Sequence, residues 1–172
     1  MLKGGPLSYT MGTPIHGYRS PMSQKVTALL IFHQTKPYHD VEAALERLAV
    51  PTERAQTLGE ASHVLSRVNP PLLVFTESEL TDGNWADVVS LSARASSPVC
   101  VIVVGQEIDT RLYASVIEVG AFDFIAPPFD ALDLAHVVRC AAGNALARRE
   151  AARNALTRPK GRQVPGYTEN QL

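Results

Sequence analysis

Glu77 is the side chain whose position in the sequence most suggests chemistry. The apolar run of residues 72–76 leads directly to it, and a polar, Gly-containing loop follows. A buried strand that ends in a carboxylate can deliver a general base or a fixed negative charge to the edge of a sheet. A general base would need a second titratable group nearby, and His33 is the candidate at another strand end. Three roles are therefore open for Glu77: a catalytic base, a permanent charge, or a polar strand end that is solvated or paired with His33. We favour the last.

Other residues with the chemistry of metal ligands are scattered. Glu79 and Asp82 follow Glu77 in the loop and could bind a metal or a phosphate, although turn formation in the TDGN stretch explains Asp82. His33 has no second His or Cys at ligand spacing. We therefore expect no metal site, no cofactor and no catalytic residue.

The two cysteines, Cys100 and Cys140, each lie in an apolar stretch and do not form a CxxC motif. Cysteines in such surroundings are typically buried free thiols. A reduced pair fits a cytoplasmic protein, because disulfides persist mainly in oxidising compartments. We expect two buried thiols and no disulfide.

The composition is that of a single globular domain with poorly structured ends. The chain has 172 residues, 45% of them hydrophobic, and a formal net charge of −1. This apolar content excludes a disordered chain, and the small charge gives no overall field that would attract nucleic acid or a membrane. No apolar run approaches the length of about 18 residues that a transmembrane helix needs. Residues 1–24 are rich in Gly, Pro and Ser and lack the apolar core of a secretion signal, which predicts a flexible arm.

From residue 25 the sequence alternates between two kinds of segment. Mostly apolar runs of strand length occupy residues 26–32, 71–76, 98–104 and 122–125, and a weaker, half-polar run, as expected of an edge strand, occupies residues 52–58. Segments with apolar residues at helical spacing occupy residues 36–48, 59–68, 84–95, 109–120 and 130–156. This alternation implies right-handed crossovers and predicts a three-layer α/β fold with a doubly wound, parallel, five-stranded sheet. The last helix either continues towards Pro159 or ends at Gly143.

In such sheets the functional groups lie at the carboxyl ends of the strands. Residues 25–142, with their five alternating strands and helices and the residues at the strand ends, resemble the receiver domain of two-component response regulators. The stretch GAFDFIAPPF, residues 120–129, is similar to a motif of that family, and the acidic strand end is followed by DGNW. The resemblance implies strand order 2-1-3-4-5 and a signalling role in the bacterial cytoplasm. It leaves residues 1–24 as the arm and residues 143–172 as a helical extension with a basic, partly disordered tail.

Five side chains would do the chemistry of a working receiver. Two acidic residues and an Asp phosphoacceptor would bind Mg²⁺, and a Thr or Ser and a Lys would contact the phosphoryl oxygens. The matching positions here are Phe32, His33, Glu77, Gly105 and Pro127. The resemblance therefore implies a degenerate pseudo-receiver that signals without phosphorylation, Mg²⁺ or enzyme activity. Glu77 could still act as a permanent mimic of a phosphorylated Asp.

Pro127–Pro128 replaces the Lys-Pro pair of the family. That Lys-Pro bond is usually cis in receivers, so the resemblance predicts a cis bond before Pro128. Its role would be to shape the strand end and not to do chemistry.

The helix at residues 109–119 and the strand after it contain a candidate partner surface. The residues expected to pack on the sheet are Leu112, Val116 and Val119. Tyr113 and Ile117 lie four residues apart on the adjacent helical face, beside Phe124 of the next strand. The corresponding surface of receivers is the usual docking and dimerisation face. We expect a protein partner of a signalling pathway to bind there, or a second copy to form a homodimer through residues 109–142.

Two other functions remain open. An unconventional phospho-responsive receiver would use Glu77, Glu79 or Asp82. A regulator associated with nucleic acid would use the basic residues near the C-terminus. These are Arg148, Arg149, Arg153, Arg158, Lys160 and Arg162. No interleaved aromatic residues or DNA-binding motif accompany them, so we do not expect a nucleic-acid partner, and we expect no membrane partner.

Overall fold

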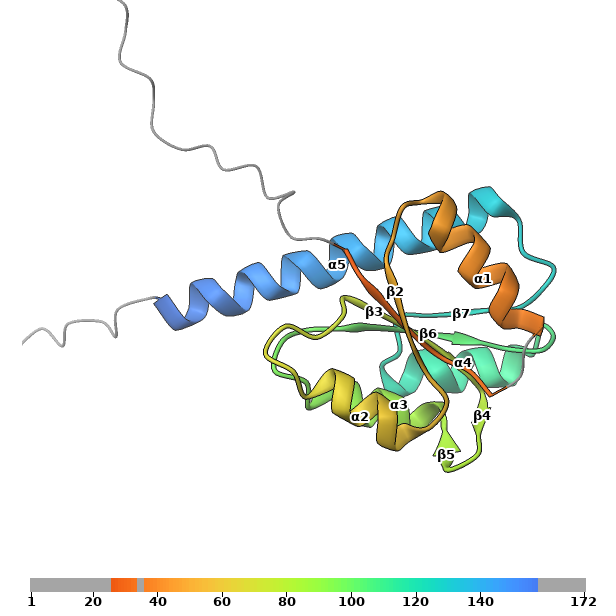
Figure 1. Cartoon of the computed structure of the whole chain (residues 1–172), viewed down its shortest axis with the longest axis horizontal. Helices are drawn as coiled ribbons and strands as arrows, with labels where there is room; N and C mark the ends of the chain where they lie inside the picture. Colours follow the sequence, from red (N-terminus) through yellow and green to blue (C-terminus); the bar gives the residue numbers. More distant parts are fainter. Residues whose placement is uncertain (1–25, 34–35, 158–172) are drawn as a thin grey trace, which may run out of the picture.

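Five parallel strands form the central sheet, in the order β2-β1-β3-β6-β7 (Figure 1). The computed structural model describes residues 26–33 and 36–157. The strands of the sheet are β1 (Ala28–Ile31), β2 (Thr52–Ala55), β3 (Leu73–Glu77), β6 (Cys100–Val104) and β7 (Asp123–Ile125). Counted over these strands, the order is the predicted 2-1-3-4-5. Because every pairing in this sheet is parallel, the carboxyl ends of the strands meet at one edge.

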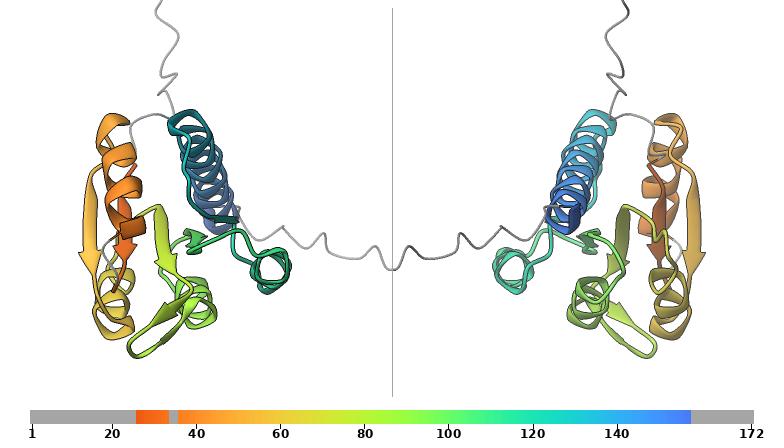
Figure 2. Two further views of the ribbon diagram at one scale, coloured as in Figure 1. Left: turned by 90° about the vertical axis from the view of Figure 1, so that its right-hand side faces the viewer. Right: turned by 90° about the vertical axis from the view of Figure 1, so that its left-hand side faces the viewer.

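Helices cover both faces of the sheet, as Figure 2 shows. α1 (Lys36–Arg47) and α5 (Ala131–Thr157) lie on one face. α2 (Leu58–Leu65), α3 (Trp85–Ala93) and α4 (Thr110–Val119) lie on the other. The predicted three-layer, doubly wound architecture is therefore confirmed.

The pleat of the strands explains their continuous apolar sequences. Phe75 and Ile102 pack toward α1 and α5, whereas Val74 and Val103 pack toward the helices on the opposite face. All four side chains are fully buried. Since successive side chains point to opposite faces, a strand that is covered on both faces must be apolar at almost every position.

A small antiparallel hairpin after β3 is an element that the sequence did not predict. β4 (Glu79–Leu80) pairs with β5 (Gly83–Asn84), and Thr81 and Asp82, the first half of the TDGN stretch, connect them. Asn84 then caps α3, because its side chain accepts a hydrogen bond from the N–H of Ala86 (2.8 Å). The Asp87 carboxylate accepts one from the N–H of Asn84 (3.0 Å), which completes a capping box.

α5 is one continuous helix, so the alternative in which it ends at Gly143 is wrong. Its packed face also continues beyond the domain boundary predicted at residue 142, because Ala145 and Arg149 are buried. The last turns of the helix project past the body of the domain (Figure 1). The helical extension is thus partly a component of the folded domain.

Arg149 connects α5 to the amino edge of the sheet by hydrogen bonds. Its side chain is 6% exposed, and burial lowers the pKa of its guanidinium. The guanidinium donates hydrogen bonds to the carbonyl oxygens of Pro98 (2.8 Å), Pro70 (2.9 Å) and Pro71 (3.0 Å). These prolines belong to the loops that precede β3 and β6, so one side chain holds three segments together.

Two predictions about side-chain burial are wrong. Val119 is 49% exposed, because it is on the last turn of α4 and this helix packs on β7, the edge strand of the sheet. Cys140 is exposed, since it lies on the side of α5 that faces away from the sheet. Cys100 is buried as predicted, and desolvation raises the pKa of its thiol. Both cysteines are free.

Some predictions concern residues outside the described ranges. They are the arm at residues 1–24 and the basic residues Arg158, Lys160 and Arg162. Among the helices that the structure describes, none combines the length and the hydropathy that a bilayer-spanning helix needs.

Candidate functional site

The structure brings the five predicted site positions to the carboxyl edge of the sheet. Phe32 and His33 follow β1, Glu77 ends β3, Gly105 follows β6 and Pro127 follows β7. Of these five residues, Glu77 carries the one carboxylate, and none carries a hydroxyl or an amine. The five predicted positions therefore lie at one edge of the sheet, with a single carboxylate among them.

Glu77 is a buried strand end, with 3% of its surface exposed. Its carboxylate accepts a hydrogen bond from the backbone N–H of His33. This bond links the ends of β1 and β3, which are neighbouring strands. Of the structural roles predicted for Glu77, the structure thus shows pairing with His33, through the backbone of His33, and not a solvated strand end.

The aromatic ring of Phe124 occupies the space beside Gly105. A Cβ atom on Gly105 would lie 2.4 Å from Cζ and 2.8 Å from Cε2 of Phe124. Non-bonded carbon atoms are best separated by about 3.5–4.0 Å, so this packing requires a residue without a side chain at position 105. The N–H of Gly105 also donates to the carbonyl of Ile125 (2.8 Å), which fixes the backbone there. A Thr or Ser at this position would collide with the ring where it now lies.

Two of the remaining positions of the edge, Phe32 and Pro127, are non-polar. The peptide bond between Pro127 and Pro128 is cis, as predicted. Phe32 is 7% exposed, and its ring meets that of Tyr38 edge to face, with centroids 5.5 Å apart. These residues close the strand ends by packing.

Asp82, in the loop between β4 and β5, accepts hydrogen bonds from the start of α2. Its Oδ1 atom accepts a hydrogen bond from the N–H of Leu58 (2.9 Å), and Oδ2 accepts one from the N–H of Gly59 (3.3 Å). Asp82 therefore satisfies the free amides at the start of α2. In residues 26–33 and 36–157, no group of three or more His, Cys, Asp or Glu side chains is placed to hold a metal ion.

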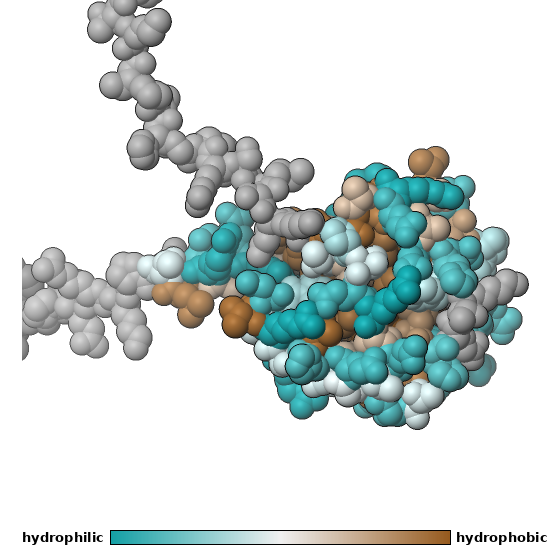
Figure 3. Space-filling model, in the orientation of Figure 1, coloured by the Kyte–Doolittle hydropathy of each residue, from teal (hydrophilic) through white to brown (hydrophobic). Residues whose placement is uncertain are grey.

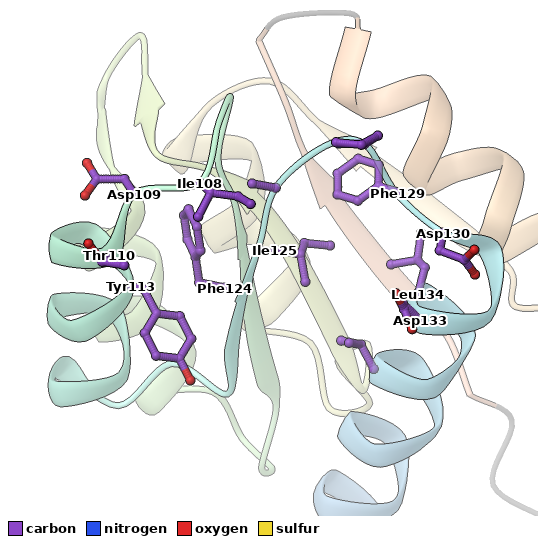
Figure 4. A pocket seen from close by; sticks show the side chains of 13 residues that line it. Ile108, Asp109, Thr110, Tyr113, Phe124, Ile125, Phe129, Asp130, Asp133 and Leu134 are labelled. Carbon is purple, nitrogen blue, oxygen red and sulfur yellow. The ribbon is translucent and has the colours of Figure 1, made fainter.

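A groove of about 310 Å³ lies over β7, between α4 and α5 (Figure 4). Tyr113 and Phe124 line its α4 side, and Phe129 and Leu134 line its α5 side. Other large apolar residues of the lining are Ile108, Ile125 and Val137. The polar residues of the lining are Asp109, Thr110, Asp130 and Asp133. The groove thus combines an apolar floor with an acidic rim.

No protein-family model matches the sequence. Parts of two curated proteins are similar to it. The response regulator protein PilR of Pseudomonas aeruginosa is 33% identical over 92 residues, which cover 52% of this chain and 20% of PilR. The photosynthetic apparatus regulatory protein RegA of Cereibacter sphaeroides is 30% identical over 114 residues, which cover 64% of this chain and 60% of RegA. The chain therefore spans less than two thirds of the length of either relative.

Solved structures of response regulators superpose on the domain. One from Thermotoga maritima has a TM-score of 0.61 and 21% identity, and covers 70% of this chain and 99% of that structure. A receiver domain protein from Clostridium thermocellum has a TM-score of 0.60 and 17% identity, and covers 69% and 95% of the two chains. The chain has the fold of a response regulator receiver domain.

On this receiver fold, the three residues predicted to bind a partner lie along the groove and α4. Tyr113 is 48% exposed and Ile117 is 40% exposed, whereas Phe124 is half-buried. The rings of Tyr113 and Phe124 meet edge to face, with centroids 6.4 Å apart. Ile108, which is 80% exposed at the groove, was not among the predicted residues. Ile108 directly precedes Asp109, which caps α4, and this position is the sequence signal that could have indicated Ile108 as a groove residue.

The opposite edge of the receiver fold has a different surface. There β2, α1 and α2 present a mostly hydrophilic face (Figure 3). The ion pair between Arg67 and Glu53 (2.7 Å) and the pair between Arg54 and Glu42 lie on this side. The apolar groove therefore distinguishes the β7 edge from the β2 edge.

The basic residues of α5 do not form a uniform cationic surface. Arg149 is buried against backbone carbonyls, and Arg148 lies near the carbonyl of Val99 (3.4 Å). Arg153 is exposed. Burial of Arg149 removes one cation from the set that a nucleic-acid contact would use.

Proposed function

We propose that this receiver-like domain acts in signal transduction by binding a protein partner, without phosphorylation of its own and without enzyme activity. The observation that carries the proposal is the packing of Phe124 against Gly105. The resemblance assigns the hydroxyl group of a working receiver to position 105, and the ring leaves no room for a side chain there.

The chemistry of the surrounding edge supports the same conclusion. Phosphoryl transfer needs a metal and a cation to offset the charge that develops on the phosphoryl oxygens. Glu77 is the single carboxylate of the five positions, and it already accepts the N–H of His33. Pro127 supplies no cation. A phosphoryl group on Glu77 would therefore be poorly stabilised.

The first prediction concerns phosphorylation. Addition of acetyl phosphate or beryllofluoride with Mg²⁺ should leave the amide NMR spectrum and the melting temperature unchanged, because Phe32, His33, Gly105 and Pro127 supply neither a carboxylate, a hydroxyl nor an amine for these reagents. Mg²⁺ alone serves as the reference sample. A saturable shift of residues near Glu77, Glu79 or Asp82 would contradict the proposal and favour an unconventional phospho-responsive receiver.

The groove and the exposed face of α4 support a docking surface at the β7 edge. Interfaces are stabilised mainly by a few large side chains that become buried at their centre, aromatic ones above all. Tyr113 and Ile117 supply such side chains, and the groove beside them can accept side chains of a partner. We therefore place the partner site on α4, β7 and the first turns of α5, with a second copy of the chain as one possible partner.

The second prediction tests this surface. Tyr113→Glu should weaken partner binding at least about tenfold, because it places a charge in an apolar contact. Affinity capture with cross-linking should recover a protein that is cross-linked to residues of the groove in the wild type and is lost in the variant. The matched control is Val68→Glu, since Val68 is 85% exposed at a distant loop.

A homodimer would be detected by light scattering of the same proteins. In that case the wild type should have twice the mass of Tyr113→Glu. A partner or a dimer that Tyr113→Glu and Phe124→Glu both retain would show that the contact lies elsewhere.

A further inference from the structure

Charge is strongly segregated along the chain around the groove. Between residues 105 and 137 there are six acidic residues and one arginine, although the whole chain has a net charge of −1. Three of the acidic residues, Asp109, Asp130 and Asp133, line the groove, and no Lys or Arg does. The groove is therefore acidic, although the protein as a whole is nearly neutral.

Two of these carboxylates also have local hydrogen bonds. Asp109 accepts from the N–H groups of Arg111 (2.9 Å) and Leu112 (3.0 Å), and Asp130 accepts from the N–H of Leu132 (2.7 Å). Each helix N-terminus offsets only about half an elementary charge, so the rim remains negative. An occupant of this groove should thus combine large apolar side chains with positive charge.

The chain has a segment with this chemistry outside the described residues. Residues 1–24 contain Lys3 and Arg19 and no acidic residue. The same segment contains Leu2, Leu7, Tyr9, Met11, Ile15 and Tyr18. We infer that the N-terminal arm, residues 1–24, binds in the acid-rimmed groove of its own chain and shields the docking surface.

Chain length allows the arm to reach the groove. The path from β1 to β7 crosses three strand spacings of about 4.8 Å and one strand length of about 17 Å, or about 30 Å with the helix layer. About ten extended residues span that distance, so residues 1–15 can lie in the groove. Tethering gives such a segment an effective concentration on the order of millimolar, at which a weak contact is substantially occupied.

The basic C-terminal tail is a poorer occupant within the same chain. Asp133 lies near the start of α5, and the helix rises about 36 Å from there to Thr157. The cations Arg158, Lys160 and Arg162 extend at most about 18 Å beyond Thr157. They cannot return to the rim of their own groove, although the tail of a second copy could reach it.

This inference rests on the proposed function, because it assigns the arm a regulatory role at the proposed docking surface. A partner would have to displace the arm before it binds. The apparent affinity of the partner would then equal its intrinsic affinity multiplied by the fraction of molecules in which the arm does not occupy the groove.

Paramagnetic NMR on the full chain tests the contact. A nitroxide is attached at Met11→Cys in a Cys140→Ser background, where buried Cys100 remains an unreactive thiol. The amides of Tyr113, Phe124 and Phe129 should lose at least half of their intensity. The amides of Glu53 and Arg67, on the opposite edge, should keep theirs.

A mixture of spin-labelled unenriched protein and isotope-enriched unlabelled protein separates the possible occupants. The inference is supported if broadening occurs when the spin label and the isotopes are on the same chain and does not occur in the mixture. Broadening in the mixed sample would mean that a second copy fills the groove, and uniform intensities in both samples would mean that the arm does not bind. Either result overturns the inference.

Charge variants provide a second measurement. Asp130→Asn with Asp133→Asn should relieve most of the broadening, since Asn at position 130 preserves the helix cap and removes the charge. Asp40→Asn, an exposed change on α1, should not. If the arm does not bind while Tyr113→Glu still abolishes partner capture, the proposed docking surface is supported and the proposed binding of the arm is refuted.

Discussion

Arg149→Ala is expected to lower the free energy of unfolding by about 3–4 kcal/mol. The guanidinium is buried and donates to the carbonyls of Pro70, Pro71 and Pro98. Hydrogen bonds to charged groups contribute about 1.5–3 kcal/mol each, although bonds made by one side chain do not add fully. Removal also leaves three carbonyls without their donor. Urea unfolding should show a lower midpoint with an unchanged slope.

The control is Arg153→Ala on the next turn of the same helix. Arg153 is exposed, so its replacement should change the free energy of unfolding by no more than about 0.5 kcal/mol. Arg149→Lys should remain destabilised, because an ammonium is a point charge and cannot span three carbonyls as a planar guanidinium does. Equal stability of the Arg149→Ala and Arg153→Ala proteins would refute the anchoring role.

Gly105→Ala is expected to destabilise the domain by about 1–3 kcal/mol, the usual cost of overpacking. The new Cβ atom would lie 2.4 Å from Cζ of Phe124, so the ring must move out of its present place. The groove side of the ring is the space available to it. Thermal or urea unfolding measures the cost, and NMR contacts between Phe124 and residue 105 report the movement.

Two variants make this prediction specific. Gly143→Ala has no atom within 4 Å of the added Cβ and lies inside α5, so it should stabilise the domain by up to about 1 kcal/mol. In a Phe124→Leu background the Gly105→Ala change should cost about 1 kcal/mol less. Additive effects of the two changes would mean that the ring does not determine the need for glycine.

The two predictions concern opposite edges of the sheet. Arg149 holds the amino edge together with polar bonds, whereas Phe124 fills the carboxyl edge with an aromatic ring. The carboxyl edge is the one at which parallel sheets usually place their chemistry. Its apolar filling in this protein supports the proposal that function depends on the neighbouring groove.

Much of the fold could be predicted because the apolar pattern is regular. The runs at β1, β3 and β6 are continuous since both sides of each strand are covered, and Gly120 ends α4 in the left-handed conformation expected of it. The hairpin of β4 and β5 was missed, because two-residue strands have no detectable periodicity. The burial of Val119 was wrongly predicted, because helical spacing does not reveal how far the sheet extends beneath a helix.

The candidate site could be located from the sequence but not described. Strand ends and the resemblance placed Glu77, Gly105 and Pro127 at one edge, where the structure has them. One partner of Glu77 is the backbone N–H of His33, and a backbone group cannot be identified from side-chain types. The groove likewise depends on the separation of α4 and α5, which no local pattern specifies.

The alternation of strands and helices, the parallel sheet and the residue types at the strand ends could be read from the sequence. These features follow from hydrophobic periodicity and from residue identity, which are local properties. The tertiary structure alone decided that Phe124 occupies the space beside Gly105, that Arg149 is an anchor and not part of a cationic surface, and that an acid-rimmed groove opens over β7. These features arise from contacts between residues far apart in the chain, whose distances depend on how the layers pack.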